Sequence, residues 1–600
     1  MGRLSMFARM LPLGGALVLS ACATTATRAP SAPVTVGVIA FNDFHGSLEA
    51  PKQSVPVETA PGTVVQVPAG GAAWLASAID GVRAKYRYSL TVSAGDMIGA
   101  SQLASSLFLD EPTIGVMNRI RVDFNAVGNH EFDRGREELK RIQSGGCTQH
   151  TSRKPCQIEP FKGAAFPFLA ANSIEKDGAT LFPGTALKSF GKGRGKVTIG
   201  IIGLTLKGTG DLSSPENLGG VHFTDEADTA NALVPKLKAA GADAIMVLIH
   251  QGGRTTGEPN PNGCTGLNGD ILPILARLDP RVDLVVSGHT HWNYVCDWSK
   301  VDPARPFLLT SAAVFGEEVT DITLEIDPKA GRVVSKRARN IIVQSPGYPN
   351  RGYSIDNQPA FPQFSPRADI AAYVATYAEA AKQFTRRPVG QLGGVVERPG
   401  GDASRSGGTL GSLIADAQLA ASAGAGAQIA FMNPFGIRAP HQIVPGEDGA
   451  VTFGQLYAVQ PFANTLITQT MTGAELKAVL EQGFDAVQPL QVLSPSQGFS
   501  YSFDVSRPVG DRVVAMSLGG VPIDPAKNYR ITTNSFLANG GDSFYGFVKQ
   551  REAVVGMPDI DALEAWLKAR PARPVPAEPR AIDLNPAATP VKPGGLMTQH

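Results

Sequence analysis

The sequence contains little cysteine, little tryptophan and no excess of charge of either sign. Five of the 600 residues are cysteine and four are tryptophan. The 54 lysines and arginines nearly balance the 53 aspartates and glutamates, so the overall charge does not indicate a nucleic-acid polymer or an acidic membrane surface as partner. No apolar run reaches the roughly 20 residues that a membrane-spanning helix needs. No such helix is therefore expected.

Length and composition indicate a globular protein with more than one domain. A chain of 600 residues exceeds what one hydrophobic core normally supports, so two large domains with terminal extensions are expected. Apolar residues make up 43% and charged residues 18%. These values are ordinary for a folded protein and argue against disorder throughout.

The N-terminus has the pattern of an export signal. Arg3 and Arg9 form a basic start, and residues 11–19 form a short apolar run. The letters LSAC at 19–22 resemble the bacterial lipobox, which would make Cys22 the acylated first residue of a mature lipoprotein. We expect a signal peptide at 1–22 and a flexible tether at 23–33. A plain secretory signal cut nearby is the alternative. The protein is expected in the periplasm or cell envelope, and at the outer membrane if the cell has two membranes.

The remaining cysteines are even in number, which suits disulfides in an exported protein. We expect the local pairs Cys147 with Cys156 and Cys264 with Cys296, because each pair brackets a stretch rich in Gly, Pro or Asn. Free buried thiols are the alternative.

A repeating pattern of strand, polar cluster and helix predicts a layered α/β domain at 34–345. Nearly all of the apolar runs end in residues that could do chemistry; the runs are 34–41, 89–93, 124–127, 197–204, 244–249 and 284–286. Ligands in open α/β sheets gather at the carboxyl ends of the strands. The pattern therefore predicts one shared site.

The rest of the chain divides into a linker, a second domain and a tail. Residues 346–388 are read as a linker that includes a helix at 368–383. A smaller α/β domain is expected at 389–570. The segment 571–600 is rich in Pro and Ala without an apolar period, so it is expected to be disordered.

Histidines, carboxylates and an asparagine follow the strands of the first domain. Asp43 and His45 are two positions apart, and side chains two apart in a strand share a face; the same holds for His289 and His291. The other candidates are Asp96, Asn129, His130 and His250. Imidazole, carboxylate and amide ligands suit zinc, manganese, iron or cobalt better than calcium.

The ordered motifs D-x-H, G-D, G-N-H-E, H and G-H-x-H resemble the calcineurin-like metallophosphoesterase pattern. The letters FNDFHG at 41–46 and GNHEFD at 128–133 are similar to the 5′-nucleotidase and UDP-sugar hydrolase branch. The resemblance implies an α/β fold with α+β layering: a four-layer metallophosphoesterase β-sandwich flanked by helices, then a smaller α/β substrate-binding domain.

The resemblance also implies roles for individual residues. One metal would be bound by Asp43, His45 and His291 and the other by Asn129, His250 and His289, with Asp96 bridging them. His130 would be the catalytic histidine, oriented by Asp133, while Glu131 would be a structural turn residue. The alternatives are a scaffold without activity and, for His130 alone, a supporting hydrogen bond.

The second domain resembles the family's substrate-binding domain. Asn433 and Arg438 lie in a segment similar to N-G-G-G-I-R, although Pro434 and Phe435 replace two of its glycines. The other implied substrate residues are Arg405, Phe462, Asn464, Phe536 and Asp542. Phe462 and Phe536 would sandwich the base and Asp542 would bind the ribose hydroxyls. Core packing is the alternative for the phenylalanines, and surface exposure is the alternative for Arg405.

The expected function is that of a 5′-nucleotidase with two divalent metal ions, zinc, manganese or cobalt. UDP-sugars or 2′,3′-cyclic nucleotides are further expected substrates. The alternatives are hydrolysis of a non-nucleotide phosphate or sulfur ester, nucleotide binding without turnover, and a structural surface role. The partners would be the nucleotide and, through the lipid anchor only, a membrane; a monomer is favoured. The helix at 368–383 would be the hinge of a domain rotation.

Overall fold

The computed structural model describes residues 32–586, apart from 152, 214, 351–352, 400–405, 439, 463, 486–489, 539, 571 and 578. The predicted signal peptide with Cys22, most of the tether, Arg405 and residues 587–600 lie outside the described residues. No helix of the described part is long and apolar enough to cross a membrane.

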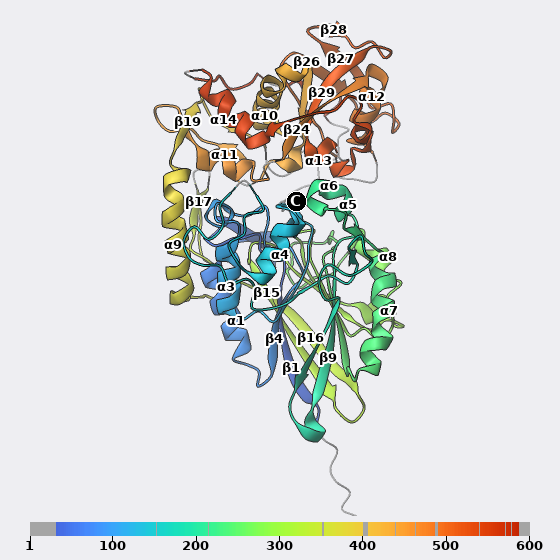
Figure 1. Ribbon diagram of the computed structural model, residues 1–600. Coiled ribbons are helices and arrows are strands. Elements are labelled where there is room, and N and C mark those ends of the chain that lie inside the picture. Colours follow the sequence, from blue (N-terminus) through green and yellow to red (C-terminus); the bar gives the residue numbers. More distant parts are fainter. Residues whose placement is uncertain are drawn as a thin grey trace, which may run out of the picture.

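Two six-stranded sheets pack face to face in the first domain (Figure 1). The first has the order β16-β15-β1-β4-β5-β6, formed by Arg332–Ile342, Glu318–Asp327, Val34–Phe41, Ser89–Ser93, Phe124–Ala126 and Phe168–Leu169. The second has the order β13-β14-β12-β11-β9-β8, formed by Asn293–Asp297, Leu308–Ala312, Leu284–Ser287, Ala244–Ile249, Val197–Leu204 and Thr185–Phe190. Every strand predicted from the sequence is present.

Helices cover the outer faces of both sheets, so the domain has the expected four layers. The first sheet is covered by α1 (Ala72–Arg83), α3 (Glu111–Ile120) and α9 (Ala368–Thr385), and the second by α7 (Glu226–Ala239) and α8 (Ile271–Leu275). Strand β1 shows why its sequence is apolar throughout. Val36 and Val38 face the core between the sheets, while Ile39 and Phe41 face the helices.

Parallel pairing brings the carboxyl ends of the central strands to one edge. Strand β1 pairs in parallel with β4, and β11 pairs in parallel with β9 and β12. The loops that follow these strands therefore lie together, facing the second domain (Figure 1).

The second domain is built on a five-stranded sheet in the order β25-β21-β29-β24-β30, formed by Ser494–Pro495, Ile429–Met432, Asn528–Asn534, Thr465–Thr472 and Val554–Pro558. Its helices include α10 (Gly408–Ala421), α11 (Phe453–Val459), α12 (Gly473–Gln482) and α14 (Asp559–Lys568). A four-stranded sheet β28-β27-β26-β31 is formed by Val521–Pro522, Val513–Leu518, Phe499–Phe503 and Ala581–Asp583.

The prediction that the whole segment 571–600 is disordered is wrong at residues 581–583, which form strand β31. Strand β31 pairs in parallel with β26. Arg580, just before it, forms hydrogen bonds of 2.7 and 3.0 Å with the carboxylate of Asp416 on α10. A short strand that adds to the edge of an existing sheet needs no apolar period of its own, so the sequence pattern did not reveal it.

Helix α9 confirms the helix predicted at 368–383 and belongs to the core of the first domain. Its buried residues Ile370, Val374 and Tyr377 share a cluster with residues of α1 and α3. The chain then crosses to the second domain, where Arg387 pairs with Glu564 of α14 at 2.8 Å. The hinge role stays a prediction.

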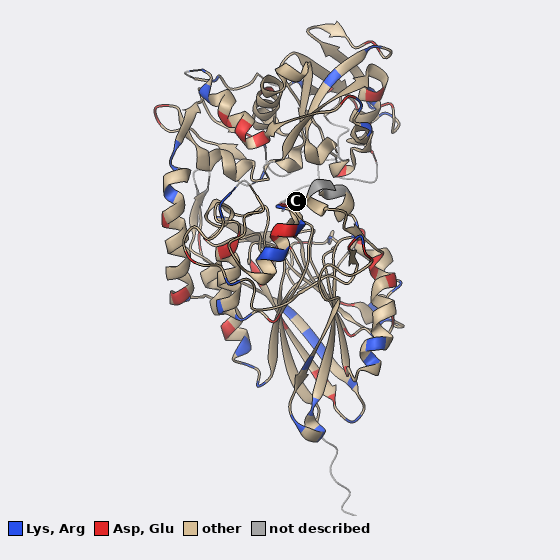
Figure 2. Ribbon diagram, in the orientation of Figure 1, with Lys and Arg blue, Asp and Glu red and all other residues tan. Residues whose placement is uncertain are grey.

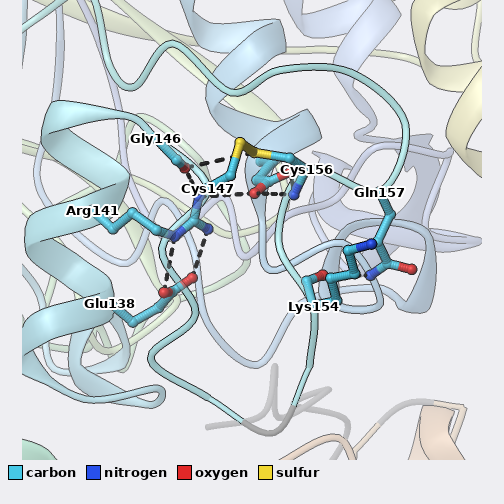
Figure 3. The surroundings of a disulfide bond; sticks show 8 residues. Glu138, Arg141, Gly146, Cys147, Lys154, Cys156 and Gln157 are labelled. Carbon is cyan, nitrogen blue, oxygen red and sulfur yellow. Dashed lines mark hydrogen bonds and ion pairs between the residues drawn. A yellow bond between two sulfur atoms is a disulfide. The ribbon is translucent and has the colours of Figure 1, made fainter.

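Both predicted disulfides are confirmed: Cys147–Cys156 and Cys264–Cys296. The first lies beside a buried ion-pair cluster that joins α4 (Arg136–Ser144) to α3. Arg141 of α4 bonds Glu138 of the same helix (Figure 3) and Glu111 at the start of α3. Glu111 also accepts a hydrogen bond of 3.0 Å from the backbone N–H of Cys156. Both signs of charge occur on α4 and on α7, in keeping with the balanced composition (Figure 2); on α7 the acidic residues lie in the first turn and the basic residues in the last.

Candidate active site

All seven predicted metal ligands lie in loops at the carboxyl ends of β1, β4, β5, β11 and β12. Five of them have left-handed backbone conformations, with φ of 50° at Asp43, 46° at His45, 49° at Asp96, 70° at His289 and 55° at His291. These positions are uncommon for residues other than glycine and are typical of functional sites. The predicted ligands converge as expected. The expectation that Asp43 and His45, and likewise His289 and His291, share a face because they lie in an extended strand is wrong, since none of the four residues is extended.

The first group of ligands is Asp43, His45 and His291, whose ligand atoms lie within 4.8 Å of one another. The Nε2 atoms of His45 and His291 are 3.1 Å apart, and Asp43 Oδ1 is 3.6 Å from His291 Nε2. His45 Nδ1 donates to the carbonyl of Gly99 at 2.9 Å, which leaves the lone pair on Nε2. Nitrogen lone pairs that face one another at this distance suit a cation between them.

The second group is Asp96, His250 and His289, and Asn129 lies among them. Asn129 Oδ1 is 3.0 Å from His250 Nε2 and 3.1 Å from His289 Nδ1. His250 Nδ1 donates to the carbonyl of Ala94 at 2.9 Å, so its Nε2 is directed into the site.

Asp96 lies between the two groups. Its Oδ2 is 3.0 Å from His250 Nε2 in one group and 3.7 Å from His45 Nε2 in the other. The donor set therefore fits two divalent cations that share one carboxylate, as the sequence predicts.

Burial and neighbouring charges together set the pKa values of these ligands. It lowers the pKa of His45 and of His289 to about 3, so both rings are neutral and able to bind metal. Burial raises the pKa of Asp43 to about 7. For His250, burial lowers the pKa, but the carboxylate of Asp96 outweighs it and brings the pKa to about 10. A cation would take the place of that proton.

Glu131 is a structural residue, in agreement with the prediction. Its carboxylate accepts hydrogen bonds from the backbone N–H groups of Asp96, Met97 and Gly128 at 3.0, 2.9 and 2.7 Å. It thereby ties the loop of Asp96 to the loop of Asn129. Gly128 is required by close packing, because a Cβ atom there would lie 2.2 Å from Asp96 Oδ1.

His130 and Asp133 form the expected pair. His130 Nδ1 is 3.0 Å from both carboxylate oxygens of Asp133, and Asp133 Oδ2 accepts from the N–H of Ala100 at 2.9 Å. Burial lowers the pKa of His130, but Asp133 and Asp96 together outweigh it, so the pKa is raised. Because Nδ1 donates to Asp133, Nε2 of His130 is a donor when the ring is protonated, the form that the raised pKa favours.

A cavity of about 1130 Å³ lies between the two domains. From the first domain it is lined by residues that include Asp96, Asn129, His130, Asp133, His289 and His291. From the second domain the lining includes every described residue predicted to bind substrate: Asn433, Arg438, Phe462, Asn464, Phe536 and Asp542.

Aromatic and cationic groups meet where the domains touch. The ring of Phe462 stacks on His130 with centroids 5.7 Å apart, and the guanidinium of Arg438 lies 5.4 Å from the Phe462 centroid. Burial lowers the pKa of Arg438 to about 10, so it remains a cation at neutral pH. Phe435, one of the residues that departs from the glycine pattern, also lines the cavity and lies under the guanidinium of Arg398.

Two polar residues of this pocket, Asn534 and Gln491, were not predicted from the sequence. Asn534 donates to Asn433 at 3.1 Å, and Gln491 donates to the carbonyl of Asp542 at 3.0 Å. Asn534 lies two positions before the candidate residue Phe536 in the sequence, and this proximity was the only signal that could have indicated Asn534 as a pocket residue.

Two family models match the chain: calcineurin-like phosphoesterase over residues 37–293 and 5′-nucleotidase, C-terminal domain, over residues 389–549. A crystal structure of a 5′-nucleotidase precursor from Thermus thermophilus is similar over 92% of this chain and 99% of that chain, with 27% identity and a TM-score of 0.66.

Two curated relatives match different lengths of the chain. Endonuclease YhcR of Bacillus subtilis is 28% identical over 547 residues, which cover 90% of this chain and only 40% of that protein. An uncharacterized protein in the pqq-V 5′ region of Acinetobacter calcoaceticus is 52% identical over 172 residues, 28% of this chain and 84% of that protein.

Proposed function

Because the chain belongs to the calcineurin-like phosphoesterase family and carries a 5′-nucleotidase C-terminal domain, we propose that it releases phosphate from nucleoside 5′-monophosphates outside the cytoplasm. The observation that carries the proposal is the shared cavity, which is lined by four of the seven proposed metal ligands from the first domain and by Asp542 from the second. The site thus offers a place for the phosphate and for the nucleoside at the same time.

Two divalent cations, when bound, would hold the phosphate and lower the pKa of a water molecule. Asp43, His45 and His291 would hold one cation, Asn129, His250 and His289 the other, and Asp96 both. The water oxygen loses a proton and forms the new bond to phosphorus while the bond from phosphorus to the ribose O5′ breaks, and the ribose oxygen that leaves takes up a proton.

The chain's own residues assist around that step. His130, held by Asp133, would in its protonated form donate a hydrogen bond from Nε2 to the phosphoryl or leaving oxygen. Arg438 brings a fixed positive charge near the carboxylates of the metal site, where its planar group can bind phosphate oxygens. Phe462 and Phe536 would stack on the base, and Asp542 would accept hydrogen bonds from the ribose.

UDP-sugars and 2′,3′-cyclic nucleotides are included in the proposed substrate range. One observation favours a second candidate, a non-nucleotide phosphate or sulfur ester: Phe435 projects into the cavity wall where the family pattern has glycine. We further propose that Cys22 is lipidated and that the protein acts in the periplasm or cell envelope as a monomer. Two disulfides in the described part support an oxidising compartment.

The test is release of phosphate by the soluble fragment that starts at residue 23, supplied with manganese, cobalt or zinc. The substrates are AMP, UDP-glucose, 2′,3′-cyclic AMP and p-nitrophenyl phosphate; for UDP-glucose and the cyclic nucleotide a phosphomonoesterase is added to free phosphate from the product. Turnover of AMP well above p-nitrophenyl phosphate supports the nucleotidase. Turnover of p-nitrophenyl phosphate without any nucleotide would instead support the second candidate.

A further inference from the structure

A chain of hydrogen bonds runs below the proposed nucleoside pocket and joins three loops of the second domain. Asn534 lies at the end of β29, Asn433 follows β21, and Asp542 lies in the turn Gly541–Ser543. Asn534 and Asn433 are each 1% exposed. Asn534 Nδ2 donates to Asn433 Oδ1 at 3.1 Å, and Asn433 Nδ2 donates to Asp542 Oδ2 at 2.7 Å.

The orientation of both amides is fixed from the two ends of this chain. At one end, Asn534 Oδ1 accepts from the backbone N–H of Leu537 at 2.9 Å, and a backbone N–H can only donate. At the other end, the carboxylate of Asp542 accepts. If either amide were turned over, two acceptors or two donors would face each other, so the order of donors and acceptors has one solution.

The hydrogen-bonded series of Asn534 and Asn433 holds Asp542 in a left-handed backbone conformation, which is unfavourable for residues other than glycine. Asp542 has φ 55° and ψ 24°, in the left-handed region. Its carbonyl accepts from Gln491 Nε2 at 3.0 Å and its Oδ2 accepts from Asn433. No hydrogen bond to the other carboxylate oxygen, Oδ1, is present within the described residues, and Asp542 lines the cavity.

Close packing shows that the amide of Asn433 has little room to move. A Cβ atom on Gly436 would lie 2.6 Å from Asn433 Oδ1. Gly436 is the glycine that the sequence keeps where Pro434 and Phe435 replace its two neighbours. The glycine that remains is therefore the one whose missing side chain lets Asn433 reach Asn534.

We propose that Asn534 is a positioning residue for ribose recognition: it sets the Asn433 amide, which in turn holds Asp542 so that Oδ1 accepts from the 2′- and 3′-hydroxyls. This inference rests on the proposed nucleotidase function. Asn534 contacts neither the metals nor the phosphate in this role, so its loss acts on the sugar and not on the reacting bond.

The test compares three substrates: AMP, 2′,3′-dideoxy-AMP, which lacks both hydroxyls, and p-nitrophenyl phosphate, which lacks the nucleoside. The variant Asn534→Asp has the same shape and still accepts from Leu537, but it cannot donate to Asn433. We expect kcat/KM for AMP to fall roughly tenfold, the size of one lost hydrogen bond to a charged group. The values for the other two substrates should stay unchanged.

The matched control is Thr533→Val on the same strand. Thr533 is buried, and its hydroxyl has no hydrogen-bond partner in the described part of the chain, so this change should affect no substrate. If Asn534→Asp does not fold, Asn534→Ala serves, with the same selective loss expected. Thermal unfolding of each variant separates a loss of fold from a loss of recognition.

An equal loss for AMP and 2′,3′-dideoxy-AMP would overturn the inference, because Asn534 would then only support the fold. Unchanged turnover of AMP in both Asn534→Asp and Asn534→Ala would also overturn the inference. A wild-type protein that hydrolyses p-nitrophenyl phosphate but not AMP would contradict the proposed function itself and with it the ribose site. A wild-type protein that turns over AMP and the dideoxy analogue equally well would overturn only the ribose inference.

Discussion

Phe462 of the second domain stacks on His130 of the first, with ring centroids 5.7 Å apart and an angle of 20° between the rings. This contact joins the residue proposed to bind the base to the residue proposed to assist the leaving group. In the proposed mechanism both domains therefore contribute to the active site.

Replacing Phe462 by Ala should raise KM for AMP about tenfold, because base stacking on an aromatic ring contributes roughly 1–3 kcal/mol. Turnover of p-nitrophenyl phosphate should change much less. Steady-state kinetics with both substrates measures the difference. Phe384→Ala on α9, at a ring that is 37% exposed, is the control. An equal loss with both substrates would mean that Phe462 acts on His130 and not on the base.

Replacing Glu131 by Gln should weaken metal binding although Glu131 is not a ligand. The carboxylate of Glu131 now accepts hydrogen bonds from the backbone N–H groups of Asp96 and Gly128. The amide N–H groups of Gln would point at these donors and could not accept from them. We expect a loss of about 10- to 100-fold in metal affinity, measured by calorimetry on chelator-treated protein. The control is Glu137→Gln, since Glu137 lies on the exposed face of α4. Unchanged affinity would show that Glu131 does not hold the ligand loops.

The sequence predicted the strands, and the candidate ligands come together in the structure, because both depend on local signals. Apolar runs such as 34–41 and 197–204 end in polar loops, and the parallel order of strands brings those loops together. The backbone of Asp43 and His45 could not be predicted, because left-handed conformations at these residues depend on contacts with the loops of Asp96 and His289.

Contacts between distant segments account for what the sequence did not reveal. Asn534 bonds Asn433, 101 positions away, and no spacing rule indicates such a pair. Strand β31 was read as disordered because its order comes from pairing with β26. Arg405 and the lipobox cysteine lie outside the described residues, so their roles stay predictions.

Removing the disulfides should destabilise the protein by amounts that follow the length of the closed loop. Replacing Cys147 and Cys156 by Ser opens a separation of 9 residues, and replacing Cys264 and Cys296 opens one of 32. Loop-closure entropy predicts a loss of about 2–3 kcal/mol for the first pair and about 1 kcal/mol more for the second. Denaturant unfolding of both double variants measures this. The reverse order would show that native contacts, and not chain entropy, dominate.

Binding of the nucleoside should weaken as the pH falls through about 6. Burial raises the pKa of Asp542 to about 6, although the hydrogen bond from Asn433 lowers it. Above this pH the carboxylate is ionised and accepts from the ribose hydroxyls; below it the group is protonated and that acceptor is lost. KM for AMP, divided by KM for p-nitrophenyl phosphate at the same pH, should therefore rise at low pH. Asp542→Asn should abolish this rise, and a rise that persists in the variant would assign it to another group.

The proposed hydrolysis requires two cations, and Asp96 would bind both. The most direct measurement is the metal content of the soluble fragment together with its release of phosphate from AMP, before and after chelation and with manganese, cobalt or zinc restored. Asp96→Ala is compared with the wild type, and His130→Ala is the variant that keeps the ligand set. The account predicts two metal ions per chain, turnover that returns with metal, none in Asp96→Ala, and full metal content with greatly reduced turnover in His130→Ala. Turnover that survives chelation, or that persists in Asp96→Ala, would contradict it.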